Sequence, residues 1–121
     1  MSEINYFNNF KKARQLLMIT EAELGHKVEN TEIAVVGSGE AKEVLISVLS
    51  GAGAIVFGES ELFSKTFDTV ILLDTVNEET LIEMLNKNAI IIDAAERIAD
   101  ETEYYMPKYY KKIRVISLQK N

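Results

Sequence analysis

Residues 33–42 read IAVVGSGEAK, in which an apolar run at 33–36 leads into a Gly-Ser-Gly turn and the start of a helical pattern. A short, continuous apolar run predicts a strand that is buried on both faces of a sheet. The helical pattern continues from Glu40 to about Leu49 and predicts the crossover to a parallel neighbouring strand. This stretch therefore indicates an α/β fold with a glycine-containing turn at the carboxyl end of its first strand.

The alternation of apolar runs and helical patterns continues along the chain. Four further runs lie at 54–57, 69–74, 89–93 and 113–118. Between the third and fourth runs, a helical pattern opens at Asn77 and reaches about Asn86. The residues from Ser60 to Thr66 suit one or two helical turns, and a polar, partly helical stretch precedes the last run. The sequence therefore predicts a three-layer α/β domain with a five-stranded, mainly parallel sheet.

Two strand orders are compatible with this pattern. We favour the order 2-1-3-4-5, because the third run is wholly apolar and suits a central position. The alternative is 3-2-1-4-5, which shortens the path that the chain must take between the second and third runs. In both orders the last run fits an edge, because it contains Arg114 and Ser117.

An N-terminal helix is predicted over residues 3–24. Its apolar stripe contains Ile4, Phe7, Phe10, Ala13, Leu16, Leu17 and Leu24. Gly25 suits the turn that ends it. This helix either covers one face of the sheet or forms the seam of a homodimer. Since no linker interrupts the chain, we expect residues 1–121 to form one domain, with the helix in 1–30 and the α/β core in 31–121.

The composition limits the chemistry that the chain can perform. Its 121 residues fit a single domain, and 47% hydrophobic with 26% charged residues is typical of a globular protein. The chain contains no cysteine and a single histidine, His26, so we predict no metal site. No apolar run reaches the roughly 20 residues that span a bilayer, and the N-terminus lacks the apolar segment of a secretory signal. We expect a cytoplasmic protein that does not enter a membrane.

The charge is unevenly distributed along the chain. The formal net charge is −6, but residues 31–103 carry 15 acidic and four basic residues, whereas residues 104–121 carry five basic and none that is acidic. An acidic body disfavours nucleic acid as a partner, because phosphate affinity depends on clustered Lys and Arg. The tyrosine- and lysine-rich segment 104–114 is compatible with three roles: base stacking, a protein interface, or rings packed on the sheet.

The candidate site lies where the first strand ends. In either strand order the sheet changes direction there, and ligands of open α/β sheets bind in the crevice at that point. Gly37 permits the tight turn, Gly39 lets a ligand approach the backbone, and the following helix directs free amides at a phosphate. Glu59 lies twenty residues after Gly39, where an acid can accept hydrogen bonds from ribose hydroxyls. The predicted cofactor-binding residues are Gly37, Ser38, Gly39, Glu59, Asp74 and Thr75.

We assign no catalytic residue from the sequence. Asp74 and Asp93 stand at the ends of the third and fourth runs, where carboxylates can bind hydroxyls or transfer protons. The same residue type often caps the helix that follows a strand, so we favour a structural role for both aspartates. Lys42 occupies the position at which dinucleotide-binding turns usually carry a third glycine.

Residues 33–118 resemble a compact Rossmann-like domain, and among named families they are most similar to the NAD-binding domain of siroheme synthase (precorrin-2 dehydrogenase). The resemblance rests on VVGSG at 35–39, GAIVF at 53–57, VILLDT at 70–75, AIIID at 89–93 and YMP at 105–107. It implies a dinucleotide at the Gly37–Gly39 turn, with Thr75 and Asn77 near the nicotinamide. The catalytic carboxylate of that family corresponds to Asp93 or Asp100, and the spacing leaves both open.

Two functional hypotheses follow from the sequence. The first is a small Rossmann-like protein that binds a nucleotide or dinucleotide, NAD or another, at the Gly37-Ser38-Gly39 turn. The alternative is a non-catalytic structural or protein-interaction module, homodimeric and without a cofactor. Whether the chain is an enzyme stays open.

Overall fold

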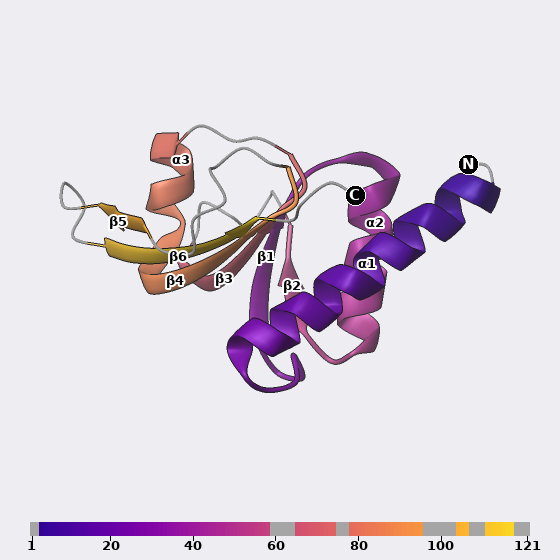
Figure 1. Cartoon of the computed structure of the whole chain (residues 1–121), viewed down its shortest axis with the longest axis horizontal. Coiled ribbons are helices and arrows are strands. Elements are labelled where there is room, and N and C mark those ends of the chain that lie inside the picture. Colours follow the sequence, from indigo (N-terminus) through magenta and orange to yellow (C-terminus); the bar gives the residue numbers. More distant parts are fainter. Residues whose placement is uncertain (1–2, 59–64, 75–77, 96–103, 107–110, 118–121) are drawn as a thin grey trace.

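The computed structural model describes residues 3–58, 65–74, 78–95, 104–106 and 111–117 (Figure 1). Its elements in chain order are α1 (Glu3–Leu24), β1 (Glu32–Val36), α2 (Gly39–Gly51), β2 (Ile55–Phe57), β3 (Phe67–Leu72), α3 (Glu78–Glu83), β4 (Leu85–Asp93), β5 (Tyr104–Met106) and β6 (Lys111–Ser117). The predicted turns over residues 60–64 lie outside the described residues, as do Asn77, Asp100 and Pro107. Lys65 and Thr66, at the end of that predicted segment, are not helical.

The strand order confirms the favoured prediction. The sheet runs β2-β1-β3-β4-β6-β5, so the five apolar runs occupy the order 2-1-3-4-5. The first five of these strands are parallel to their neighbours, and β5 pairs antiparallel with β6. The additional strand β5 lies in the stretch predicted as polar and partly helical. It contains three residues, which is too short to show a period in the sequence.

Because β5 pairs with its outer side, β6 is not the edge strand that its polar residues suggested. Arg114 and Ser117 stand in register with Ile90 and Asp93 of β4. The prediction that this strand lies at the edge of the sheet was wrong. A polar residue within a strand indicates only that its own side chain has a polar environment. Whether the backbone of that strand has one neighbour or two is a separate property, which the position of β5 decides here.

The two faces of the sheet are covered by different helices. Ile33 and Val35 of β1 pack in one apolar cluster with α1 and α2, whereas Ala34 and Val36 pack in a second cluster with α3. Both clusters consist of fully or nearly fully buried side chains. This division explains the continuous apolar runs, because alternate residues of a strand point to opposite faces and both faces are buried. The result is the predicted three-layer, Rossmann-like architecture.

The N-terminal helix α1 has the predicted boundaries and lies beside α2 (Figure 1). Ala13, Leu16 and Leu17 are buried in the cluster that α1 shares with α2 and the sheet. Phe7 and Phe10 belong to the predicted stripe, but 56% and 43% of their surfaces are exposed. The stripe therefore covers the domain only in part. None of the described helices combines the length and the apolar character needed to cross a membrane.

Helix α3 is shorter than predicted, and β4 begins earlier. The helix ends at Glu83 rather than near Asn86, and β4 starts at Leu85. The side chain of Asn86 donates to Asp68 Oδ1 at 2.8 Å and accepts a hydrogen bond from Thr66 Oγ1, so it is bound to the start of β3. These contacts join residues 18 and 20 positions apart, and they override the local helical pattern.

Candidate functional site

The candidate site lies at the carboxyl ends of β1 and β3, where the sheet changes direction. The chain leaves β1 toward β2 on one side, whereas β3 and β4 lie on the other side. The carbonyl of Val36 accepts the backbone N–H of Leu73 at 2.7 Å and that of Asp74 at 3.3 Å. These two bonds hold the residues after β3 against the end of β1. The Gly-Ser-Gly turn and Asp74 are therefore neighbours, as the strand order 2-1-3 predicts.

Gly37 is required by the packing of these two strand ends. It is buried, and a Cβ atom at this position would stand 2.8 Å from Leu73 Cβ. That distance is shorter than real Cβ contacts allow, so a larger residue would force the turn and β3 apart. The close approach to Leu73 is a second reason for glycine here, besides the tight turn that the sequence predicted.

Gly39 is required by its backbone conformation. It is the first residue of α2 and has a φ of +79°, in the left-handed region that favours glycine. No heavy atom lies within 4 Å of the position that a Cβ would occupy. The space above the first amides of α2 is therefore open on this side. A ligand there would meet backbone rather than a side chain.

Ser38 stands at the N-cap of α2 but does not cap it. Its backbone is extended, with φ −149° and ψ 166°, and its side chain makes no hydrogen bond to the helix. The hydroxyl instead donates to Asp74 Oδ2 at 3.3 Å, and both residues are exposed. The amides in the first turn of α2 thus receive no hydrogen bond from Ser38, the position that usually supplies one.

Two charged side chains modify the electrostatics of this crevice. Glu40 lies in the first turn of α2, where the helix dipole favours an acid. Its carboxylate would also repel a second anion at the same amides. Lys42 is half-buried in the same turn, at the position of the missing third glycine. The hydrogen-bond donors at this site are the first backbone amides of α2 and the Ser38 hydroxyl, and the acceptor is the carboxylate of Asp74.

Asp93 serves the turn that follows β4. It is completely buried, lies in register with Leu72 of β3, and accepts the backbone N–H of Ala95 at 2.9 Å through Oδ1. A carboxylate that bonds the amide two residues ahead stabilises a turn. This contact supports the structural alternative for Asp93.

The structure brings together four of the six predicted cofactor-binding residues: Gly37, Ser38, Gly39 and Asp74. Glu59 and Thr75 lie outside the described residues. The hydrogen bond between Ser38 and Asp74 was not predicted, although the favoured strand order contained its signal: both residues directly follow neighbouring parallel strands.

The residues at this site do not form a Ser-His-Asp catalytic triad. The single histidine, His26, lies after the C-terminus of α1 and places Nδ1 2.7 Å from the carbonyl oxygen of Lys27. Within the described parts of the chain, no three acidic or histidine side chains are arranged to hold a metal ion. The arrangement that is present can bind an anion and a hydroxyl side by side.

No protein-family model and no curated protein matches the chain. The resemblance to the NAD-binding domain of siroheme synthase stays a prediction.

Proposed function

We propose that the chain binds a nucleotide or dinucleotide in the crevice between the Gly37–Gly39 turn and Asp74. The observation that carries this proposal is the orientation of Ser38. Its hydroxyl turns to Asp74 across the crevice and leaves the amides of α2 without a cap from this residue. A phosphate is the ligand that such amides and the helix dipole favour.

The remaining geometry suits the sugar of the same ligand. Asp74 is exposed and ionisable, and a carboxylate next to a phosphate site can accept hydrogen bonds from ribose hydroxyls. The open space at Gly39 lets the phosphate approach the backbone closely. NAD is the first ligand to test, because of the resemblance to an NAD-binding domain. In the cytoplasm, where we expect the protein, nucleotides are available.

Thermal unfolding in the presence of NAD, NADP, ATP, GTP and S-adenosylmethionine tests the proposal. A ligand that binds only the folded state at 100 times its Kd stabilises it by about 2.7 kcal/mol. We expect at least one nucleotide to raise the Tm. Absence of a shift with all five at millimolar concentration would contradict a nucleotide site.

The variant Ser38→Asp separates loss of binding from loss of folding. An aspartate at the N-cap can accept hydrogen bonds from the first amides and repels phosphate, so it should abolish the ligand shift. Its repulsion from Asp74 opposes the gain from capping, so the Tm of the free protein should change little. Ser50→Asp is the matched control, because it introduces the same charge at an exposed serine near the other end of α2. A ligand shift that survives in Ser38→Asp would refute the assigned site.

A second candidate function, a protein-interaction module, is favoured by a different observation. The outward side of α1 exposes Phe7, Phe10 and Met18, the last with 64% of its surface accessible. Large apolar side chains on one helix face are typical of interaction surfaces. This face is separate from the crevice at β1 and β3, so the two functions can coexist.

A further inference from the structure

We propose that the outer face of α1 and the groove between α1 and α2 form a self-complementary surface that binds a second copy of this chain. The surface is here called the α1–α2 face. It consists of Phe7, Phe10, Lys11, Arg14, Leu17 and Met18 of α1, and of the exposed side of α2 from Glu43 to Ala52. The proposal does not depend on the nucleotide site.

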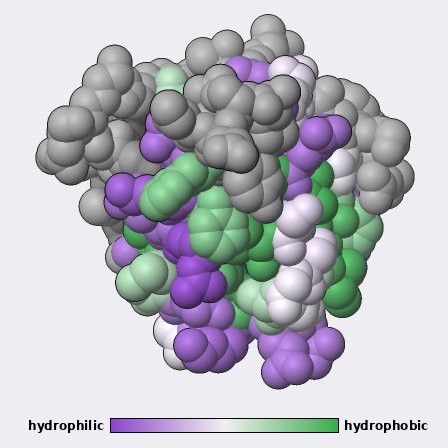
Figure 2. Space-filling model, turned by 90° about the vertical axis from the view of Figure 1, so that its right-hand side faces the viewer, coloured by the Kyte–Doolittle hydropathy of each residue, from purple (hydrophilic) through white to green (hydrophobic). Residues whose placement is uncertain are grey.

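Three large apolar side chains form a ridge along the outer side of α1. Phe7, Phe10 and Met18 recur at spacings that place them along one side of the helix, and all three are substantially exposed. The N-terminal turns of α1 extend beyond α2 (Figure 1). Figure 2 views the molecule from that side and shows hydrophobic surface at its centre, with hydrophilic side chains beside it. The ridge therefore lacks a covering element within the described chain.

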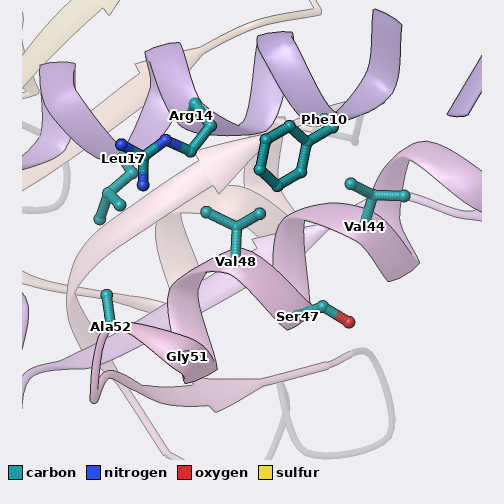
Figure 3. Close-up of a pocket in the computed structure, with 8 residues that line it drawn as sticks. All are labelled: Phe10, Arg14, Leu17, Val44, Ser47, Val48, Gly51 and Ala52. Carbon is teal, nitrogen blue, oxygen red and sulfur yellow. The ribbon is translucent and has the colours of Figure 1, made fainter. Parts of the chain in front are cut away.

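The same face also carries a groove that can receive such a ridge. A depression of about 330 Å³ separates α1 from α2, and its apolar wall comes from Phe10, Leu17, Val44, Val48 and Ala52. Figure 3 shows Phe10 and Val48 pointing toward one another across it, whereas Ser47 points away from α1. A twofold interface needs a self-complementary surface. Here the ridge of each copy can enter the groove of the other, because each copy carries a ridge and a groove on the same face.

Charge complementarity identifies a second copy as the occupant. Lys11, Lys12 and Arg14 are exposed, and none of them forms an ion pair with any described residue. The Nζ atom of Lys11 lies 5.7 Å from the centroid of the Phe7 ring. Residues 31–103 carry the acid excess of the chain. Glu43 directly precedes Val44, which lines the groove, and it is exposed and forms no ion pair with a described residue. Arg14 of one copy can therefore meet Glu43 of the other.

The dimensions of the surface agree with a dimer. The 22 residues of α1 extend about 33 Å, and two adjacent helices form a layer about 20 Å wide. Because α2 has 13 residues and extends about 20 Å, the two-helix layer is about 20 Å long and α1 continues alone beyond it. The surface therefore offers roughly 530 Å² per copy, or about 1,060 Å² for the pair, just above the roughly 1,000 Å² that a specific interface needs. An anionic membrane would also attract the three cations of α1, but it would repel the acidic body, so we favour the second copy.

Sedimentation velocity on the full chain between about 1 and 200 µM tests the proposal. We expect a concentration-dependent dimer that Met18→Glu converts to a monomer. Met18 is mostly exposed, so this change should leave the Tm nearly unaltered. Ile55→Lys is the control, because Ile55 is 47% exposed but lies on the opposite face of the sheet, in register with Glu32, where a lysine introduces a charge without like-charge repulsion. A wild-type chain that stays monomeric at 200 µM would overturn the proposal.

Charge reversal locates the contact and separates it from lipid binding. Arg14→Glu and Glu43→Arg should each weaken the dimer about tenfold or more, and the double variant should recover most of the loss. If the face instead binds anionic lipid, Glu43→Arg should strengthen sedimentation with phosphatidylserine vesicles. A dimer that is insensitive to both single changes, or vesicle binding by a monomeric wild type, would refute the proposed surface.

Discussion

At the scale of single residues, the two glycines near the opposite ends of α2 should respond to alanine in opposite directions. Gly37→Ala should lower the free energy of unfolding by about 1–3 kcal/mol, because the added Cβ would stand 2.8 Å from Leu73 Cβ and the turn must move. Gly51→Ala should raise it by about 0.5–1 kcal/mol, because no heavy atom lies within 4 Å of that position in the last turn of α2. Urea unfolding measures both. Equal effects of the two changes would contradict the packing of Gly37 on Leu73.

Asp74 should distinguish ligands with a ribose from simple phosphates. Asp74→Asn removes the charged acceptor that we assign to the sugar, so the Kd of an effective nucleotide should rise about tenfold. The affinity for pyrophosphate should stay the same or increase, because one negative charge leaves the crevice. Calorimetric titration of both ligands measures the contrast, with Glu83→Gln as the control at an exposed carboxylate of α3. A parallel loss of both affinities would exclude the ribose contact.

The residues of the turn could be predicted from the sequence, whereas their partners could not. A glycine pair after an apolar run indicates a turn because only local backbone geometry is involved. The contact of Gly37 with Leu73 and the hydrogen bond from Ser38 to Asp74 each join residues 36 positions apart. Such contacts depend on the strand order, which the apolar runs predicted, and also on the register and side-chain orientations, which local sequence patterns do not contain.

At the scale of elements, α1 is attached to the domain by one side only. Leu16 is 1% exposed within the cluster that joins α1, α2 and the sheet, so Leu16→Ala should destabilise the protein by about 2–5 kcal/mol. Gln15→Ala, at the adjacent exposed position, should change stability by less than about 0.5 kcal/mol. Chemical denaturation measures both, and a small effect of Leu16→Ala would mean that α1 does not pack as described.

The boundaries of α1 were predictable because they depend on local signals. Gly25 ends the helix as expected, with a φ of +79° and its N–H on the carbonyl of Glu21 at 2.9 Å. The side of the helix that faces the domain was harder to predict. The predicted apolar stripe includes Phe7 and Phe10 as well as Leu16 and Leu17, and only a partner helix decides which of these are covered.

The early start of β4 leads to a prediction at Asn88. This residue has a φ of +67° near the irregular register between β3 and β4, and it is exposed. Asn88→Gly should be neutral or stabilising, because glycine adopts this conformation freely. Asn88→Ala should destabilise by about 1 kcal/mol, because other L-residues adopt it at a cost. Thermal unfolding of the two variants compares them directly, and the reverse order would contradict this conformation.

At the scale of the whole molecule, the parallel sheet could be predicted because its rules are global. Continuous apolar runs separated by helical patterns allow few topologies, and the apolar third run selected the central position that β3 occupies. The antiparallel β5 could not be predicted, because three residues between polar segments carry no periodic signal. Secondary structure and strand order were thus predicted best for strands that are buried on both faces, because their sequences are continuous apolar runs.

The charge imbalance of the whole chain should make its stability depend on salt. At pH 7 the formal net charge is −6, and the described residues contain two ion pairs, Lys27 with Glu21 and Lys65 with Glu32. Because the net charge is strongly negative, repulsion among like charges should be the larger electrostatic effect, and salt screens it. We expect the Tm to rise by roughly 3–6 °C between about 10 mM and 0.5 M KCl. The measurement uses the Met18→Glu variant, so that dissociation of a dimer does not enter, and it is repeated near the sequence pI of about 4.8, where the net charge vanishes and the rise should disappear. A Tm that falls with salt at pH 7 would show that attractive pairs dominate repulsion in this fold.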